Sequence, residues 1–166
     1  MKTKLIIIRG NSGSGKTTIA KQLQHELGPG TLVVSQDTVR RDMLHVKDRH
    51  ANPSVELIRI IAEYGKNKSK YVIVEGILGK EIYQDMLYKL IQFFDNNADV
   101  YYFNLSFSET VKRHQTKKNA HEFGIQKLKQ WWLEEDYLGV ENEITLPEKL
   151  SENEIMTLIL RNGSRT

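Results

Sequence analysis

The chain has 166 residues, a length typical of one domain, and its net charge of +3 is too small to indicate nucleic-acid binding by itself. It contains no cysteine, which excludes disulfide bonds and thiolate metal sites, and we expect a cytoplasmic protein. No apolar run approaches the ~20 residues that cross a bilayer, and the sequence begins directly with a strand pattern, so we expect neither a membrane span nor a signal peptide.

The first predicted element is a short buried strand, Leu5–Ile8, which is rich in β-branched residues. Apolar residues spaced by four (Ile19, Leu23 and Leu27) then predict a helix. The segment between them follows the P-loop pattern G-x-x-x-x-G-K-[ST], whose glycines let backbone amides curl around phosphate. We therefore predict that nucleotide phosphates are bound by Gly10, Asn11, Ser12, Gly13, Ser14, Gly15, Lys16, Thr17 and Thr18.

Two residues of this loop have distinct predicted roles. Lys16 is expected to reach the β- and γ-phosphates, and the Thr17 hydroxyl to take one site on Mg²⁺. The alternative is a glycine-rich turn that binds nothing. A strand directly before the motif and a helix directly after it favour the phosphate site.

The second predicted strand, Thr31–Ser35, is followed by Asp37 at the sheet edge where ligands bind. Asp37 is predicted to be a general base for a substrate hydroxyl or a ligand of Mg²⁺, and the alternative role is to cap a helix over Thr38–Leu44. Arg40 lies one helical turn later and is predicted to stabilise the migrating phosphoryl group. Arg41 is expected to point elsewhere, as a surface charge.

A helix is predicted over Pro53–Tyr64 and a third strand over Tyr71–Leu78. Glu75 in this strand is similar to a Walker B acid, which orients Mg²⁺ or its waters. We predict that Glu75 contributes to the metal site. The alternative is that it bonds local amides or pairs with an arginine.

Further helix and strand patterns cover Glu81–Phe94 and Asp99–Phe107. Ser108 is expected to cap a helix over Glu109–Gln115, which carries Arg113. The polar stretch from about residue 113 to 124 is predicted to be a lid that closes over the nucleotide and brings positive charge to the transferring phosphate. A solvated basic loop is the alternative.

The C-terminal part is predicted to contain a helix over Ile125–Tyr137, with both tryptophans in the core, and a short strand over Asn142–Leu146. Ser151 and Glu154 form a capping box that begins a last helix, which runs to about Leu160. Strands that alternate with helices predict a parallel sheet covered on both faces, in one domain over residues 1–166.

Three segments resemble those of the small P-loop kinases: the loop GNSGSGKTT, the stretch SQDTVRR and the stretch SFSETVKRHQTKK. The resemblance is strongest to the group of polynucleotide 5′-kinases, zeta toxins and chloramphenicol phosphotransferases. It implies a three-layer α/β/α P-loop fold with a five-stranded parallel sheet and a lid, and it implies ATP and Mg²⁺. It further implies that Asp37 is the base, that Arg40 contacts substrate or phosphate, and that Arg113 and Lys117 are basic lid residues.

Together these features predict a kinase that transfers the γ-phosphoryl group of ATP to a hydroxyl of a small molecule, such as a nucleoside, sugar or antibiotic. A GTPase-like switch is disfavoured because Asn67–Lys70, the nearest match to the guanine-reading motif, lacks the final Asp. A mechanical ATPase normally has an Asp-Glu pair where this chain has Glu75 and Gly76.

A polynucleotide 5′-hydroxyl kinase is the enzymatic alternative. A basic block comprising Arg40, Arg41, Lys47 and Arg49 is suited to following a phosphate backbone. No aromatic residue accompanies this block, so stacking platforms are missing there, and a small acceptor is preferred.

Overall fold

The computed structural model describes residues 2–116 and 124–163. Within these residues, five strands form one sheet in the order β2-β3-β1-β4-β5, and every neighbouring pair is parallel. The predicted five-stranded parallel sheet is therefore confirmed. Its strands are β1 (Lys4–Gly10), β2 (Leu32–Ser35), β3 (Tyr71–Gly76), β4 (Ala98–Asn104) and β5 (Glu143–Pro147).

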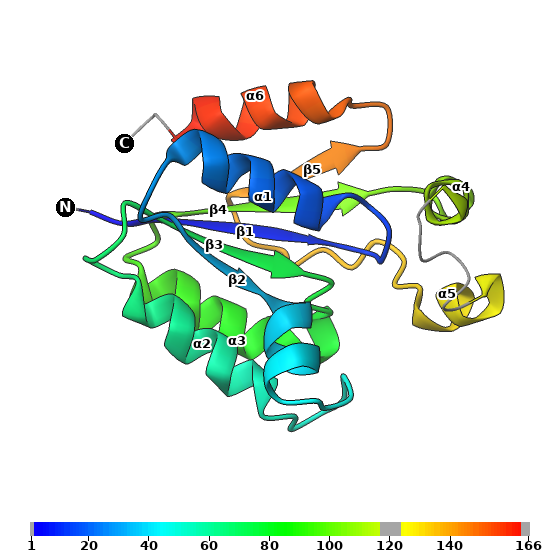
Figure 1. Cartoon of the computed structure of the whole chain (residues 1–166), viewed down its shortest axis with the longest axis horizontal. Coiled ribbons are helices and arrows are strands. Elements are labelled where there is room, and N and C mark those ends of the chain that lie inside the picture. The colour runs from blue at the N-terminus through cyan, green and yellow to red at the C-terminus, as the bar shows by residue number, and fades with distance from the viewer. Residues whose placement is uncertain (1, 117–123, 164–166) are drawn as a thin grey trace.

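Four of the helices cover the sheet, two on each face (Figure 1). The helices α1 (Lys16–Leu27) and α6 (Glu152–Gly163) lie on one face, and α2 (Ser54–Tyr64) and α3 (Lys80–Phe93) lie on the other. This arrangement is the predicted three-layer α/β/α fold. Of the described helices, none is long and apolar enough to cross a membrane.

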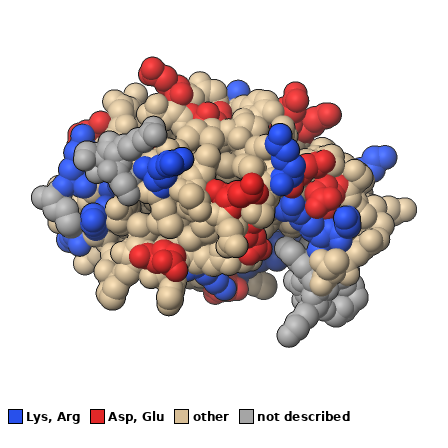
Figure 2. Space-filling model, turned by 90° about the horizontal axis from the view of Figure 1, so that it is seen from above, with Lys and Arg blue, Asp and Glu red and all other residues tan. Residues whose placement is uncertain are grey.

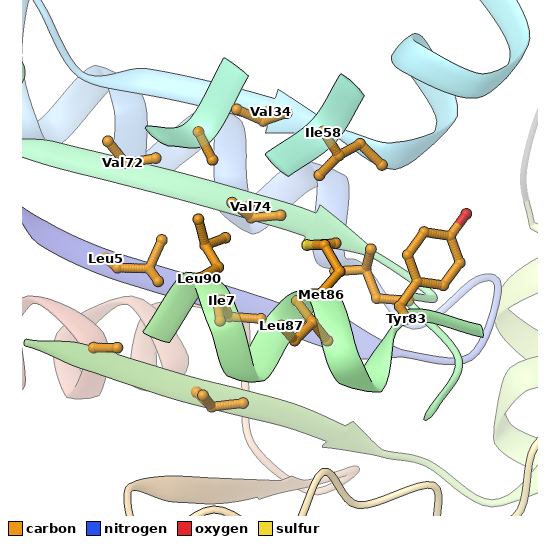
Figure 3. Close-up of a cluster of buried hydrophobic side chains, with 14 of the residues drawn as sticks. Leu5, Ile7, Val34, Ile58, Val72, Val74, Tyr83, Met86, Leu87 and Leu90 are labelled. Carbon is orange, nitrogen blue, oxygen red and sulfur yellow. The ribbon is translucent and has the colours of Figure 1, made fainter. Parts of the chain in front are cut away.

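The apolar run of β1 explains why both faces must be covered. Its side chains alternate, so Leu5 and Ile7 belong to the core cluster beneath α2 and α3, whereas Ile6 and Ile8 pack on the opposite side with α1 and α6. Figure 3 shows the first of these clusters, where Leu5 and Ile7 lie among side chains of α3 and the neighbouring strands.

The remaining helices lie at the carboxyl ends of the strands. They are η1 (Thr38–Met43), α4 (Phe107–Gln115) and α5 (Ile125–Trp131). The predicted helix after β2 is present, but it is a π-helix in which the N–H of Leu44 donates to the carbonyl of Val39, five residues earlier. Figure 1 shows α4 and α5 beyond the tips of β1 and β4.

The predicted helix over Ile125–Tyr137 is too long, because α5 ends at Trp131. The side chain of Asn11 takes both polar backbone groups of Leu133: its amide donates to the Leu133 carbonyl at 2.6 Å, and its oxygen accepts from the Leu133 N–H at 2.8 Å. Those groups are therefore unavailable to continue the helix.

The predicted serine caps of α4 and α6 differ in outcome. The cap of α4 is Ser106 and not Ser108, since the Ser106 hydroxyl accepts from the Glu109 N–H at 3.2 Å. The capping box of α6 is confirmed: the Glu154 carboxylate accepts from the N–H of Ser151, whose hydroxyl accepts from the N–H of Glu154.

Candidate active site

The P-loop joins β1 to α1 in the predicted way. Gly15 precedes the helix with φ of 98°, a left-handed conformation that glycine adopts without strain. The Lys16 side chain is buried, and its ammonium donates to the Asn11 carbonyl at 2.7 Å and to the Ser14 hydroxyl at 3.1 Å. The charge is therefore held across the curve of the loop, where an anion would bind.

Glu75 faces the P-loop from the end of β3. The Thr17 hydroxyl lies 3.3 Å from each oxygen of the Glu75 carboxylate, which is only 2% exposed. Among the described residues, no basic side chain pairs with Glu75, so the predicted alternative of an arginine partner is not observed. A buried carboxylate without a cation requires compensation, and hydroxyl and carboxylate oxygens are the ligands that Mg²⁺ prefers, so these residues fit that ion.

Asp37 stands at the tip of β2 and is 65% exposed. Although it immediately precedes η1, its side chain makes no capping hydrogen bond, which argues against a purely capping role. Its carboxylate instead lies 3.3 Å from the Arg40 guanidinium and 3.4 Å from that of Arg41.

The two arginines differ from what the sequence predicts. Arg41, expected to point away, lines the same cavity as Asp37 and the P-loop. Arg40 contacts Asp37 as expected, but its side chain is only 13% exposed and donates to the Val46 carbonyl at 3.0 Å. Residues three and four positions later lie on the same face of a helical turn, so both arginines reach the Asp37 carboxylate.

A buried network fixes the backbone that carries Asp37. The Gln36 amide donates to Asp48 and to the Tyr83 hydroxyl, both at 3.0 Å, and its oxygen accepts from the Leu78 N–H at 2.8 Å. Burial raises the pKa of Tyr83 to about 12, so its hydroxyl stays protonated and donates to Asp48. Gly76 packs directly against Gln36, leaving no space for a side chain there.

Arg113 connects α4 to the P-loop. Its guanidinium donates to the Ser14 carbonyl at 3.2 Å and to the Glu109 carboxylate at 2.9 Å. The predicted lid extends from about residue 113 to 124, and residues 117–123, including Lys117, lie outside the described residues.

One cavity of about 140 Å³ collects much of this chemistry. It is bordered by Asp37, Arg41 and Glu75 and, unexpectedly, by Trp131. Trp131 was expected in the core but is 46% exposed, because α5 ends there. The P-loop residues that line the cavity are Ser12, Gly13, Gly15, Lys16, Thr17 and Thr18.

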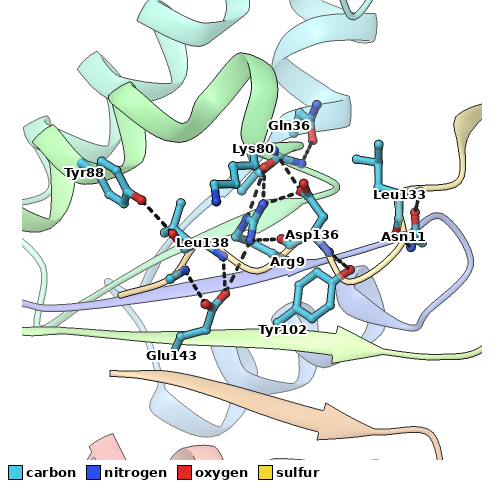
Figure 4. A network of polar contacts seen from close by, with 12 residues as sticks. Arg9, Asn11, Gln36, Lys80, Tyr88, Tyr102, Leu133, Asp136, Leu138 and Glu143 are labelled. Atoms are coloured by element: carbon cyan, nitrogen blue, oxygen red, sulfur yellow. Dashed lines mark hydrogen bonds and ion pairs between the residues drawn. The ribbon is translucent and has the colours of Figure 1, made fainter. Parts of the chain in front are cut away.

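Sequence reasoning also missed the buried network around Arg9, drawn in Figure 4. Arg9 is fully buried in β1, where its guanidinium lies 2.8 Å from the Asp136 carboxylate and 3.5 Å from that of Glu143. It also donates to the Leu78 carbonyl. The available signal was a single charge in an otherwise apolar strand, which requires buried partners.

Sequence comparison identifies a family for this chain. The model of a family described as an AAA domain matches residues 5–131. The chain belongs to this AAA domain family. The matched AAA domain contains the P-loop, Asp37, Glu75, Arg113 and Trp131, and it leaves out β5 and α6. A comparison with curated protein sequences found no match.

Solved structures share the fold of this AAA domain protein over nearly its whole length. A gluconokinase from Sinorhizobium meliloti 1021 aligns with a TM-score of 0.70 at 16% identity, covering 99% of this chain and 93% of the other. A putative kinase from Chloroflexus aurantiacus aligns with a TM-score of 0.68 at 17% identity, covering 98% of each chain.

A third structure contains ligands according to its description: the Mycobacterium tuberculosis APS kinase CysC in complex with AMPPNP and APS. It aligns with a TM-score of 0.67 at 15% identity, covering 96% of each chain. At these identities the likeness establishes the α/β P-loop fold. The finer grouping with polynucleotide kinases, zeta toxins and chloramphenicol phosphotransferases stays a prediction.

Proposed function

We propose that the protein is an ATP-dependent kinase that transfers the γ-phosphoryl group to a hydroxyl of a small molecule. The observation that carries the proposal is the single cavity in which the P-loop residues Lys16 and Thr17 meet Glu75 and Asp37. A phosphate loop, an oxygen-rich metal position and an exposed carboxylate are the parts that phosphoryl transfer requires. Fold relatives described as a gluconokinase and an APS kinase support it.

In this proposal the loop amides and Lys16 hold the β- and γ-phosphates. Thr17 and Glu75, assisted by Asp37, would hold Mg²⁺, which when bound would supply positive charge to offset that of the phosphates. Asp37 accepts the proton of the acceptor hydroxyl, whose oxygen forms a bond to the γ-phosphorus while the bond to the β–γ bridging oxygen breaks. ADP leaves, and the phosphorylated alcohol remains.

The arginines have supporting roles in the proposal. Arg40 steadies the Asp37 carboxylate from its buried side. Arg113 ties α4 to the P-loop through Ser14, and we propose that it turns toward the phosphates when nucleotide is bound, together with Lys117 of the lid.

The burial and pairing of the arginines in the predicted basic block favour a small acceptor over a polynucleotide. Arg40 is largely buried and Arg41 is paired with Asp37, which leaves Lys47 and Arg49 as its exposed members without such a pairing. On the other side of the molecule, over α1 and α6 (Figure 2), basic and acidic side chains are interspersed and do not form a continuous basic track.

The test is phosphoryl transfer by the purified protein with ATP and Mg²⁺. Candidate acceptors are nucleosides, D-gluconate and a 5′-hydroxyl oligonucleotide, and both ADP and the phosphorylated product are measured. We expect transfer to a small alcohol by the native protein and none by Lys16→Ala, which lacks the charge opposite the phosphates. Transfer that survives Lys16→Ala, or transfer to the oligonucleotide alone, would contradict the proposal.

A further inference from the structure

The position of Trp131 gives information about the acceptor. Trp131 ends α5 and lines the cavity that is also lined by Thr17 and Asp37. Single exposed apolar residues are common on protein surfaces and need no explanation. A large aromatic ring in the wall of the cavity that holds the candidate base is a different case, because a ligand there must contact it.

The indole is carried by a fixed piece of backbone. One turn earlier, Leu128 is buried, which holds the helix against the protein. The next residue, Trp132, packs edge-on against Phe107 with ring centroids 5.4 Å apart. Beyond it, Leu133 makes its two hydrogen bonds to Asn11 of the P-loop. Trp131 is therefore positioned relative to the phosphate-binding loop itself, and the binding wall is preorganised.

The charges of the cavity wall are already engaged. Its cationic side chains are Lys16, which serves the phosphates in the proposed reaction, and Arg41, which lies 3.4 Å from Asp37. Among the described residues, the cavity wall therefore provides no further cation to pair with an acidic acceptor, which favours an uncharged one. The wall also contains the indole of Trp131, which is 46% exposed and suits a flat, unsaturated ring.

We infer that Trp131 is a stacking wall for the acceptor, and that the acceptor is an alcohol bearing a flat unsaturated ring, with a nucleoside as the matching class. The inference rests on the proposed kinase function. The hydroxyl of such a molecule meets Asp37 while its ring lies on the indole. An open-chain polyol acid such as gluconate has hydroxyls but no ring to place there.

The binding test uses the fact that the chain has only two tryptophans. In Trp132→Phe, Trp131 becomes the single indole reporter. With AMPPNP and Mg²⁺ present to occupy the donor site, the protein is titrated with uridine, adenosine and D-gluconate. We expect saturable quenching by a nucleoside and no change with D-gluconate. Quenching by D-gluconate, or by none of the three, would overturn the inference.

The kinetic test compares Trp131→Ala, Trp131→Phe and a matched control, Ile125→Ala. Ile125 lies on the same helix with a similar exposure, 45% against 46%, but does not line the cavity. Loss of one stacking contact predicts an acceptor KM raised about ten- to hundredfold in Trp131→Ala. The kcat and the KM for ATP should stay near the native values. We expect Trp131→Phe to retain most of the acceptor affinity and Ile125→Ala to behave as native.

The outcomes separate this inference from the kinase proposal. Trp131→Ala could raise the KM for ATP in place of the acceptor KM, or change neither KM. In either case the inference that Trp131 stacks on the acceptor is wrong, while Lys16-dependent transfer still supports the kinase proposal. If no acceptor is phosphorylated at all, the kinase proposal fails, and the fluorescence titration still decides whether Trp131 contacts a nucleoside.

Discussion

Asp37 unites the features of a general base and of a helix start, and one substitution separates the two roles. Asp37→Asn keeps the shape but cannot accept a proton. We expect it to lower kcat by about 10²–10⁴-fold, the usual contribution of general-base catalysis, while ATP affinity changes little. Turnover kinetics and nucleotide titration of the same variant measure both quantities.

Two other results would assign Asp37 differently. An almost fully active Asn variant would indicate a structural residue, because Asn caps helices about as well as Asp. A parallel loss of Mg²⁺-dependent nucleotide affinity would indicate that Asp37 mainly organises the metal.

At this scale the sequence predicted the residues that local motifs specify and missed those that depend on helix geometry. The P-loop and Asp37 follow directly from a pattern and from a strand end. The contact of Arg41 with Asp37 is an i,i+4 pair on one helix face, and the exposure of Trp131 depends on the end of α5. A regular 3.6-residue periodicity is consistent with the first but does not predict where α5 ends.

The turn after β3 controls the position of Asp37 through Gln36. A methyl group at Gly76, where φ is 157°, would collide with the Gln36 side chain. We expect Gly76→Ala to displace Gln36 and to lower kcat by about 10²-fold, the cost typical of misplacing a catalytic group by ~1 Å. Steady-state kinetics and a melting curve measure the effect.

Gly30→Ala is the matched control for that substitution. Gly30 also has a positive φ, of 85°, but no neighbouring atom lies where a Cβ would be placed. It should lose stability and keep its kcat. Equal kinetic effects in both variants would show that Gln36 is not the connection to Asp37.

The capping box of α6 predicts a pH-dependent stability. The N–H and hydroxyl of Ser151 both donate to Glu154 and lower the pKa of that carboxyl below its ordinary value of 4.5. A carboxyl with a lowered pKa stabilises the folded state above its ordinary pKa, and this contribution is lost as the pH falls through the folded-state pKa. Glu154→Gln should therefore lower Tm near neutral pH and have a vanishing effect in acid.

Glu152→Gln, in the same helical turn, is the control for this effect. Glu152 accepts a hydrogen bond from Gln22 and takes no part in the capping box. Its substitution should not reproduce the pH-dependent difference in Tm. A Glu154→Gln effect that is constant with pH would contradict the assigned role of the box.

The elements themselves were largely visible in the sequence, because most strands are rich in apolar residues and the last helix has its own start signal. Element ends were less visible, and the end of α5 is the clearest case. There the backbone of Leu133 bonds to Asn11, a residue 122 positions away, and no local pattern carries that information.

For the whole molecule, nucleotide binding should appear as thermal stabilisation. A ligand at about 100 times its Kd adds roughly 2.7 kcal/mol to the folded state. For a chain of this size that corresponds to a rise in Tm of about 5–10 °C. We expect this shift with AMPPNP and Mg²⁺, measured by thermal denaturation, and a much smaller one for Lys16→Ala. An equal shift in that variant would place the nucleotide elsewhere.

The buried charge of Arg9 limits how far the chain can be shortened from its C-terminal side and still fold stably. The family match ends at Trp131, yet Asp136 and Glu143, the carboxylates that neutralise Arg9, come later, as does Leu133, the partner of Asn11. A gene fragment ending at Trp131 would encode every proposed catalytic side chain and still leave a cation in the centre of the sheet without its counter-charges, at a cost of about 3–5 kcal/mol. The family match over residues 5–131 is therefore shorter than the segment that must be kept together when this domain is transferred or fused to another protein.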